Sequence, residues 1–479
     1  MQAGWFSRVA QRAAPSLVDP GFRRYWAGQL ISALGAWMQS FTLSWVGMEL
    51  SPSPFWQGVL GFAQYTPIFF LTFFAGAVAD RVKKRNMLLI TQTCLTLLAL
   101  LMGVVFLTGI QSYPILLVAA VLNGTFMAFD MPARHSFVGE LVPRDIIKNA
   151  IAFNSTAFNI ARIIGPMLGG FVMAGLGSGW CFVSNAVSFL PFLYFIFTSK
   201  GGRTVANTKR TNMLHEMLDG FKHIGASRIL LRTSIVAFVV MTMVTNYNIL
   251  IPLTARDSLR LTESGGGILY TWLGVGAIAG SIGTAVTHRV ANRRGLFEII
   301  CVFAALATLF IGFQGNYLIT AITLMLTGLT FASFTTLTNS ILQTHSTDEY
   351  RGRVVSMYSW IVGGTAPIGN LICGTLADAH VPGTDPGTGL PYVQDPDAPW
   401  FAWFWCAIIC LILLVGIYTT LFFVYRKKRL ERAGPAIRLQ AAVNVEAAKE
   451  LITEDDGDGE AKEDASSAGE DKPNGEGQQ

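Results

Sequence analysis

A short run of small and charged residues, Gly76, Asp80, Arg81 and Arg85, lies where an apolar segment gives way to a basic loop. A glycine one helical turn before an acid lets a second helix approach closely, and the acid can accept hydrogen bonds from the N-terminus of that helix. The spacing therefore predicts a charged contact between two helices. The alternative is a basic loop that only fixes membrane topology. Asp130, near the end of a later apolar segment, is expected to pair with Arg81 and to form a relay with Asp80.

A second motif, Gly165, Pro166, Gly169 and Gly170, lies inside one apolar segment. Proline bends a helix, and small residues let a neighbouring helix come close. We expect this helix to pack against the glycine-rich segment that contains Gly274, Gly276, Gly280 and Gly283.

Arg162 is the one basic residue inside a predicted membrane span. A charge is costly in lipid, so this side chain should face a cavity or a partner. Two interpretations stay open: Arg162 binds an anionic substrate, or it belongs to a structural ion pair.

Further polar and aromatic residues in the spans are candidates for substrate binding or proton coupling. Each could line a cavity or make a hydrogen bond that packs two helices. Asp378, near the end of a span, could accept a proton from outside or simply be hydrated. No acid falls in the middle third of any predicted span, so the sequence leaves uniport open beside proton coupling. The other candidates are Gln29, Gln39, Gln64, Asn123, Asn154 and Asn159, with Trp37, Tyr65, Asn246, Tyr247 and Asn339.

The composition indicates a membrane protein: 52% of the 479 residues are hydrophobic and only 14% are charged, against about 25% charged residues in soluble domains. The formal net charge of +5 does not indicate nucleic-acid binding, because the basic residues fall in short clusters between apolar runs. None of the six cysteines shows metal-ligand spacing, so we expect neither a metal site nor disulfides. No phosphate-binding loop or nucleophile motif occurs, so we expect neither an enzyme nor a cofactor.

Windows of about 20 mostly apolar residues, the length that crosses a bilayer, occur twelve times. We therefore expect an all-α integral membrane protein with twelve transmembrane helices in two six-helix bundles. The predicted spans are Tyr25–Met48, Phe55–Ala79, Met87–Gly109, Tyr113–Met131, Ala150–Gly175, Trp180–Thr198, Leu230–Thr254, Gly265–Thr287, Leu296–Phe313, Tyr317–Gln343, Val354–Ala377 and Phe401–Val424.

Most of the 35 lysines and arginines alternate with the spans so that they fall on one side of the membrane. This places both termini in the cytoplasm and the chain in the inner, or plasma, membrane. No cleavable signal peptide is expected. The predicted domains are an N-terminal segment (1–20), a first bundle (21–199), a cytoplasmic linker (200–228), a second bundle (229–425) and a disordered acidic tail (426–479). A surface helix is predicted in the linker, over Met213–Ile224.

The two halves repeat weakly, as in Leu122-Asn123-Gly124 and Leu326-Thr327-Gly328. Parallel six-helix repeats are typical of transporters that rock between two states. The repeat supports the division into two bundles.

Together with the run from Gly76 to Arg85, several longer stretches resemble one branch of the major facilitator superfamily, that of enterobactin exporters and macrolide efflux proteins. The resemblance covers about residues 20–425. Its motifs are Trp26, Gln29, Gly35, Trp37, Met38 and Gln39, then Pro132-Ala133-Arg134, Glu140-Leu141-Val142-Pro143, Asn159-Ile160-Ala161-Arg162, Arg351-Gly352-Arg353-Val354 and Gly374-Thr375-Leu376-Ala377-Asp378.

The resemblance implies alternating access and proton-driven efflux of siderophores, macrolides or other amphiphiles. It implies that Asp80 helps to close a cytoplasmic gate against the start of the eleventh helix near Gly352, and that Gly165 to Gly170 form an antiporter-like helix. We therefore expect a monomeric exporter whose partners are the lipid bilayer, a small-molecule substrate and protons. The alternative is a uniporter or an importer of a small metabolite on the same fold.

Overall fold

The computed structural model describes residues 14–51, 53–143, 145–199, 213–286, 293–312, 315–347, 349–379 and 398–432. Within these ranges, the side chains of residues 73, 77, 80, 81, 213–218, 285, 286, 293, 294, 312, 398 and 421–432 are not described. Residues 433–479 of the predicted acidic tail (426–479) and the first thirteen residues lie outside the described residues.

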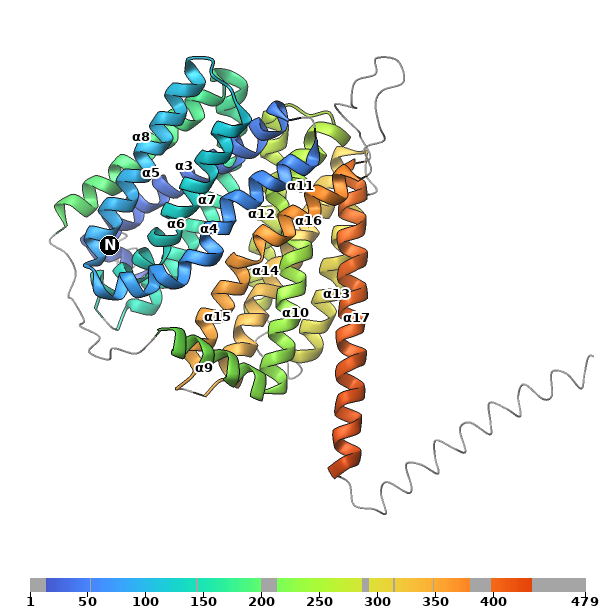
Figure 1. The fold of residues 1–479 in the computed structure, drawn as a ribbon. Coiled ribbons are helices and arrows are strands. Elements are labelled where there is room, and N and C mark those ends of the chain that lie inside the picture. Colours follow the sequence, from blue (N-terminus) through green and yellow to red (C-terminus); the bar gives the residue numbers. More distant parts are fainter. Residues whose placement is uncertain are drawn as a thin grey trace, which may run out of the picture. The chain divides into compact units, whose positions relative to one another are not determined.

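The described residues fold into helices joined by short connections (Figure 1). In the first half they are α2 (Pro15–Val18), α3 (Pro20–Leu50), α4 (Pro54–Arg81), α5 (Lys84–Leu107), α6 (Tyr113–Leu141), α7 (Ile147–Leu176) and α8 (Ser178–Thr198). In the second half they are α9 (Met213–Ala226), α10 (Arg228–Val244), α11 (Tyr247–Leu253), the π-helix η1 (Thr254–Ser258), α12 (Glu263–Val286), α13 (Arg293–Gly312), α14 (Tyr317–His345), α15 (Arg351–Gly364), α16 (Ala366–Asp378) and α17 (Ala398–Arg432).

Local sequence explains where several helices begin. Asp19 caps α3 by accepting a hydrogen bond from the Phe22 amide at 2.7 Å, and Pro20 at the first helical position needs no amide partner. Gly177 joins α7 to α8 in a left-handed conformation with φ of 91°, which a residue without a side chain adopts at no steric cost.

Nine helical segments in the described residues are long and apolar enough to cross a membrane. Helix α13 is apolar but shorter by the same measure, over Gly295–Ile311. Helix α3 reaches membrane length while burying polar residues such as Gln29, Ser32 and Gln39 against other helices. Two of the nine segments are broken: α10, α11 and η1 form one of them, and α15 and α16 form the other. The nine segments, together with α3, α4 and α13, correspond in position to the twelve predicted spans. The predicted all-α fold is confirmed.

Within the first half, α3 packs against α7 and α8, α4 against α6, and α5 against α8. Within the second half, α14 packs against both α12 and α13. Two long contacts join the halves: α7 lies along α12, and α4 lies along α16. Small residues allow this closeness, because a Cβ atom at Gly374 on α16 would lie 2.6 Å from the Cα atom of Gly58 on α4.

Two ends of this helical body are distinguished below by their residues. The basic end contains Arg24 of α3, Lys84 of α5 and Arg353 of α15, and the capped end contains Ser53 beside α4, Glu263 of α12 and Asp378 of α16. The predicted surface helix corresponds to α9 and begins at the predicted residue, Met213. It lies at the basic end, where the Asp219 carboxylate is 3.7 Å from the Arg353 guanidinium.

One predicted boundary is wrong. The fourth span was expected to end at Met131, but α6 continues for ten residues to Leu141. Its last turns bury Ala133, Phe137 and Val138 in a hydrophobic core with Phe22 of α3, and this apolar stripe continues the helix although charged residues alternate with it. The consequence is that Asp130 falls in the middle third of α6 rather than at its end.

The chain separates into two compact units, residues 1–414 and 415–479. All helices that form the site below belong to the first unit. Of the second unit, the structure describes the remainder of α17 as a helix up to Arg432. The predicted disorder is therefore wrong for residues 426–432, which continue this helix. The predicted boundaries between bundles and linker stay a prediction.

Candidate functional site

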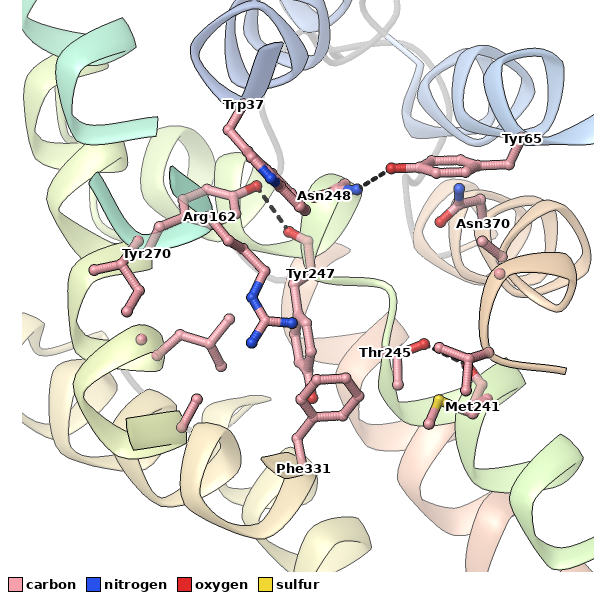
Figure 2. A pocket seen from close by; sticks show the side chains of 17 residues that line it. Trp37, Tyr65, Arg162, Met241, Thr245, Tyr247, Asn248, Tyr270, Phe331 and Asn370 are labelled. Carbon is pink, nitrogen blue, oxygen red and sulfur yellow. Dashed lines mark hydrogen bonds between the residues drawn. The ribbon is translucent and has the colours of Figure 1, made fainter. Parts of the chain in front are cut away.

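A cavity of about 210 Å³ lies between the two halves of the first unit (Figure 2). Helices α3, α4 and α7 form one wall, and the segments from α10 to α16 form the other. The lining residues are Trp37, Tyr65, Arg162, Ile163, Met241, Thr245, Tyr247, Asn248, Tyr270, Leu273, Gly274, Ala277, Phe331, Val362, Gly363, Ala366 and Asn370.

Arg162 reaches into this cavity from α7, and Figure 2 shows its guanidinium group directed toward Tyr247 and Phe331. Its Nη2 atom donates a hydrogen bond to Asn159 Oδ1 at 3.0 Å. Its Cζ atom lies 5.6 Å from the centroid of the Phe331 ring, within the range of a cation–π interaction. Both groups are neutral, so among the described residues these contacts leave the positive charge of Arg162 without a carboxylate.

Aromatic hydroxyl groups in the cavity wall hold the second half in place. The Asn248 side chain donates a hydrogen bond to the Tyr65 hydroxyl at 2.6 Å, which joins the two halves. The Tyr270 hydroxyl donates to the backbone carbonyl of Tyr247 at 3.1 Å. Both hydrogen bonds appear in Figure 2, and they fix the orientation of the aromatic rings.

Two helix breaks lie at the cavity. The first separates α10 from α11 at Thr245 and Asn246, and the Asn246 side chain donates to the freed carbonyl of Thr242 at 2.7 Å. The second separates α15 from α16 at Thr365, two residues before Pro367, which has no amide hydrogen to continue the helix. Broken helices at the middle of the membrane are typical of transporter binding sites, because irregular backbone is tolerated only where it lines a cavity.

The capped end is closed by hydrogen bonds between the halves. The Ser53 hydroxyl donates to the Asp378 carboxylate, the Arg256 guanidinium donates to the Met48 carbonyl at 2.6 Å, and the Ser44 hydroxyl donates to the Asn248 carbonyl. Toward the basic end, Trp360 Nε1 donates a hydrogen bond to the Phe69 carbonyl at 3.3 Å, which also joins the two halves. The cavity is therefore sealed on the side of Ser53 and Asp378.

The motif residues of the predicted antiporter-like helix are buried, and its small residues divide between two neighbours. Gly165 and Gly169 face α3, where a Cβ atom at Gly165 would lie 2.9 Å from the Leu34 carbonyl oxygen. Gly170 faces α12, where a Cβ atom would lie 2.3 Å from the Glu263 carbonyl oxygen. A Cβ atom at Gly267 of α12 would lie 2.5 Å from the Pro166 carbonyl oxygen.

The expected packing between α7 and α12 is therefore present, although two of the four glycines named for it belong to another contact. Gly276 and Gly280 of α12 face the carbonyl groups of Met325 and Leu329 on α14. Gly274 does face α7, where a Cβ atom would lie 2.0 Å from a side-chain carbon of Ile163.

The predicted gate is described only in part. Asp80 and Arg81 lie in the last turn of α4, and Gly76 lies one turn earlier. The side chains of Asp80 and Arg81 are not among the described ones. Arg85 donates from Nε to the Ile196 carbonyl at 2.9 Å and from Nη2 to the Phe197 carbonyl at 2.6 Å, and it thereby caps the end of α8. The gate contact near Gly352 stays a prediction.

Asp130 pairs with Arg134, which lies beyond the predicted end of the fourth span. Its carboxylate accepts hydrogen bonds from Arg134 Nε at 2.6 Å, Gln92 Nε2 at 2.7 Å and the Thr91 hydroxyl at 2.9 Å. Arg134 is only 5% exposed and lies over the Phe192 ring, 4.5 Å from its centroid. Arg162 is therefore not the one basic residue inside a membrane helix, and an acid does occupy the middle third of a span. The expected Asp130–Arg81 contact stays a prediction.

The other sequence-predicted polar candidates do not belong to the lining of the cavity. Asn159 contacts Arg162. Gln39 Oε1 accepts a hydrogen bond from Asn185 at 2.6 Å, which packs α3 against α8. Gln29 and Asn154 are buried, and Gln64 and Asn123 are half-buried on the facing helices α4 and α6. Of the aromatic candidates, Trp37, Tyr65 and Tyr247 do line the cavity.

Several lining residues were missed, of which Asn248, Asn370, Tyr270 and Phe331 are the largest or most polar. The two asparagines carried a usable signal, because each is an amide inside an apolar span. The two aromatic residues carried none, since aromatic side chains fill membrane helices throughout the chain.

Comparison with known proteins agrees with this arrangement. The sequence model of the family described as "Transmembrane secretion effector" matches residues 12–384. The chain is 25% identical to the staphyloferrin A transporter of Staphylococcus aureus over 362 residues, which cover 74% of this chain and 89% of that protein. It is 23% identical to the multidrug efflux pump Tap of Mycolicibacterium fortuitum, with 70% of this chain and 84% of the pump covered.

A solved structure shares the fold. The crystal structure of a bacterial homologue of the human lysosomal transporter Spinster, in an inward-facing and unoccupied conformation, matches with a TM-score of 0.65 at 14% identity, over 87% of this chain and 99% of that one. The chain is thus a multi-pass membrane transporter rather than an enzyme, and it belongs to the transmembrane secretion effector family of the major facilitator superfamily.

Proposed function

We propose that this protein exports small amphiphilic molecules from the cytoplasm by alternating access, in exchange for protons. The observation that carries the proposal is the cavity between the halves, lined by broken helices and closed at the capped end by the Ser53–Asp378 and Arg256–Met48 contacts. A substrate site that is closed toward one side of the membrane is what a rocking transporter needs in each of its two states.

The positive-inside pattern assigns the two sides. The basic end faces the cytoplasm of a bacterial plasma membrane, with both termini there, and the capped end faces outside. In this assignment the cavity is loaded from the cytoplasm, which is the binding step of an exporter. The protein acts as a monomer with the lipid bilayer around it.

Two features support export coupled to protons. Two proteins with related sequences are named as a multidrug efflux pump and as a staphyloferrin A transporter. The name of the pump fits efflux of a siderophore, a macrolide or another amphiphile. The helix that contains Gly165, Pro166, Gly169 and Gly170 packs tightly against both α3 and α12, as expected for the antiporter-like helix. Asp378, hydrogen-bonded across the closed end by Ser53, is the proposed coupling acid.

The cytoplasmic gate completes the cycle. Asp80, with Gly76, Arg81, Arg85 and Asp130 behind it, is proposed to close the basic end when the capped end opens. The side chain of Arg85 ties the start of α5 to the end of α8, so this gate residue is held within the first half.

The test uses inverted membrane vesicles with an acid interior, in which the quenching of a pH-sensitive dye reports the proton gradient. Catecholate siderophores, macrolides, lipophilic cations and aromatic carboxylates are added in turn. Recovery of fluorescence that requires this protein, and that is lost in Asp378→Asn, is the expected result. Saturable uptake of a labelled compound without any proton movement would instead establish a uniporter or importer on the same fold.

A further inference from the structure

The cavity carries one positive charge and, in the described residues, no negative one. Arg162 is the single charged residue among those that line it. Its contacts are the neutral amide of Asn159 and the ring of Phe331. Burying a charge without a counter-charge is costly, so the site gains free energy from any anion that enters it.

Three other arginines in the helices of this unit each pair with a carboxylate. Arg134 of α6 pairs with Asp130 at 2.6 Å, and Arg256 of η1 pairs with Asp257 at 2.5 Å. Arg232 of α10 pairs with Glu298 of α13. Among the described residues, Arg162 has no such carboxylate partner, and its guanidinium group can donate further hydrogen bonds to a ligand.

The walls around the guanidinium group are flat and largely apolar. Trp37 and Tyr65 come from the first half, and Tyr247, Tyr270 and Phe331 come from the second. Figure 2 shows the rings of Tyr247 and Phe331 beside the Arg162 side chain. An aromatic or other flat apolar body would pack against these rings, while Asn370 and Thr245 offer hydrogen bonds to neutral polar groups.

We propose that this cavity selects amphiphilic organic carboxylates and that Arg162 is the residue which recognises the carboxylate. The inference rests on the proposed function and names its substrate class. A guanidinium group matches the planar carboxylate with two parallel hydrogen bonds. The single cation of the site balances one negative charge, and a lipophilic cation in the same place would meet only repulsion from Arg162.

The experiment uses equilibrium dialysis to measure the binding of three probes to the full-length protein in lipid nanodiscs. The probes share one ring system, and their intrinsic fluorescence gives their concentrations. The probes are anthracene-9-carboxylate, the neutral anthracene-9-carboxamide, and the cationic (anthracen-9-ylmethyl)trimethylammonium. The carboxylate is expected to bind at least about tenfold more tightly than either other probe, the lower range for a hydrogen bond to a charged group.

Variants assign the preference to Arg162. Arg162→Gln keeps hydrogen-bonding capacity without charge and is expected to abolish the preference for the carboxylate. Arg162→Lys keeps the charge but not the planar group that makes two parallel hydrogen bonds, and it is expected to retain part of the preference. Arg24→Gln removes an exposed arginine of α3 and serves as the control, with unchanged preference. Monodisperse elution of each variant verifies that it is folded.

Three outcomes overturn the inference: no binding of the carboxylate, equal binding of the three probes, or an unchanged preference in Arg162→Gln. The dialysis requires no transport. Carboxylate-selective binding without proton-linked efflux would therefore overturn the proposed function alone, and proton-linked efflux without carboxylate selectivity would overturn this inference alone.

Discussion

Arg134 follows Asp130 by one helical turn on α6, and its Nε atom lies 2.6 Å from an oxygen of that carboxylate. Both side chains are almost fully buried, with exposed fractions of 7% for Arg134 and 1% for Asp130. Gln92 and Thr91 of α5 donate two further hydrogen bonds to the same carboxylate. This ion pair joins α5 to α6 and lies inside the first half rather than in the cavity between the halves.

Asp130→Asn should therefore destabilise the protein. Removing one member of a buried ion pair leaves the other charge uncompensated, which costs about 3–5 kcal/mol. The melting temperature of the purified variant, followed by tryptophan fluorescence in detergent, should fall clearly below that of the wild type.

The double variant Asp130→Asn/Arg134→Gln is the control, because it removes both charges and should recover most of the lost stability. If the double variant melts at the same temperature as Asp130→Asn, the pair does not act as a structural unit. If Asp130→Asn melts like the wild type yet fails to transport, Asp130 acts in the gate and not in packing.

Asp80→Asn should leave membrane insertion and stability unchanged and should reduce efflux by about fivefold or more, the lower range of a coupling between two conformational states. The amide of asparagine has no negative charge, so it loses the favourable electrostatic interaction with the N-terminus of the facing helix. Efflux of anthracene-9-carboxylate from proteoliposomes gives the rate. Asp145→Asn, at an exposed acid in the next connection on the same side, is the matched control, and equal rates for the two variants would contradict the gate.

The sequence was sufficient to predict the membrane helices, because each span is a long apolar run and basic residues alternate with the spans. It failed at the end of α6, where the apolar stripe of Ala133, Phe137 and Val138 continues between polar residues. The spacing of four residues between Asp130 and Arg134 did indicate a possible pair on one helix face, but only the longer helix buries it.

The cavity could be predicted from its charge and only in part from its walls, of which Trp37, Tyr65 and Tyr247 were candidates. A lone arginine in an apolar span has few tolerable surroundings, so Arg162 was identified as a candidate. Asn248 and Asn370 face the cavity because their helices begin anew after the breaks at Thr245–Asn246 and Thr365. A helical periodicity that is continued across a break assigns residues to the wrong face of the helix. Only the second break has a nearby proline, Pro367, that could have indicated it in the sequence.

Gly374→Leu should hold the capped end open. A Cβ atom at Gly374 would lie 2.6 Å from the Cα atom of Gly58, so a larger side chain prevents α16 from closing against α4. Efflux should fall at least about tenfold, which a shift of about 1.4 kcal/mol between the two states would produce. Gly283→Leu is the control, since a Cβ atom there meets no heavy atom within 4 Å.

Spin labels report the same closure directly. Trp56 of α4 and Thr375 of α16 are exposed near the capped end and accept labels through cysteines in a Cys94→Ser background. The distance between the labels should increase in Gly374→Leu and stay unchanged in Gly283→Leu. An unchanged distance in Gly374→Leu would contradict the closure of α4 against α16.

Trp37→Ala should weaken the binding of all three anthracene probes by a similar factor, about tenfold. Trp37 lines the cavity from α3, and the loss of a large aromatic surface removes packing that depends on the ring of the probe and not on its charge. This uniform loss is the opposite pattern to that of Arg162→Gln, which should weaken the carboxylate alone. Equilibrium dialysis with the same probes gives both patterns in one experiment. A charge-selective effect of Trp37→Ala would mean that the ring positions Arg162 rather than the body of the ligand.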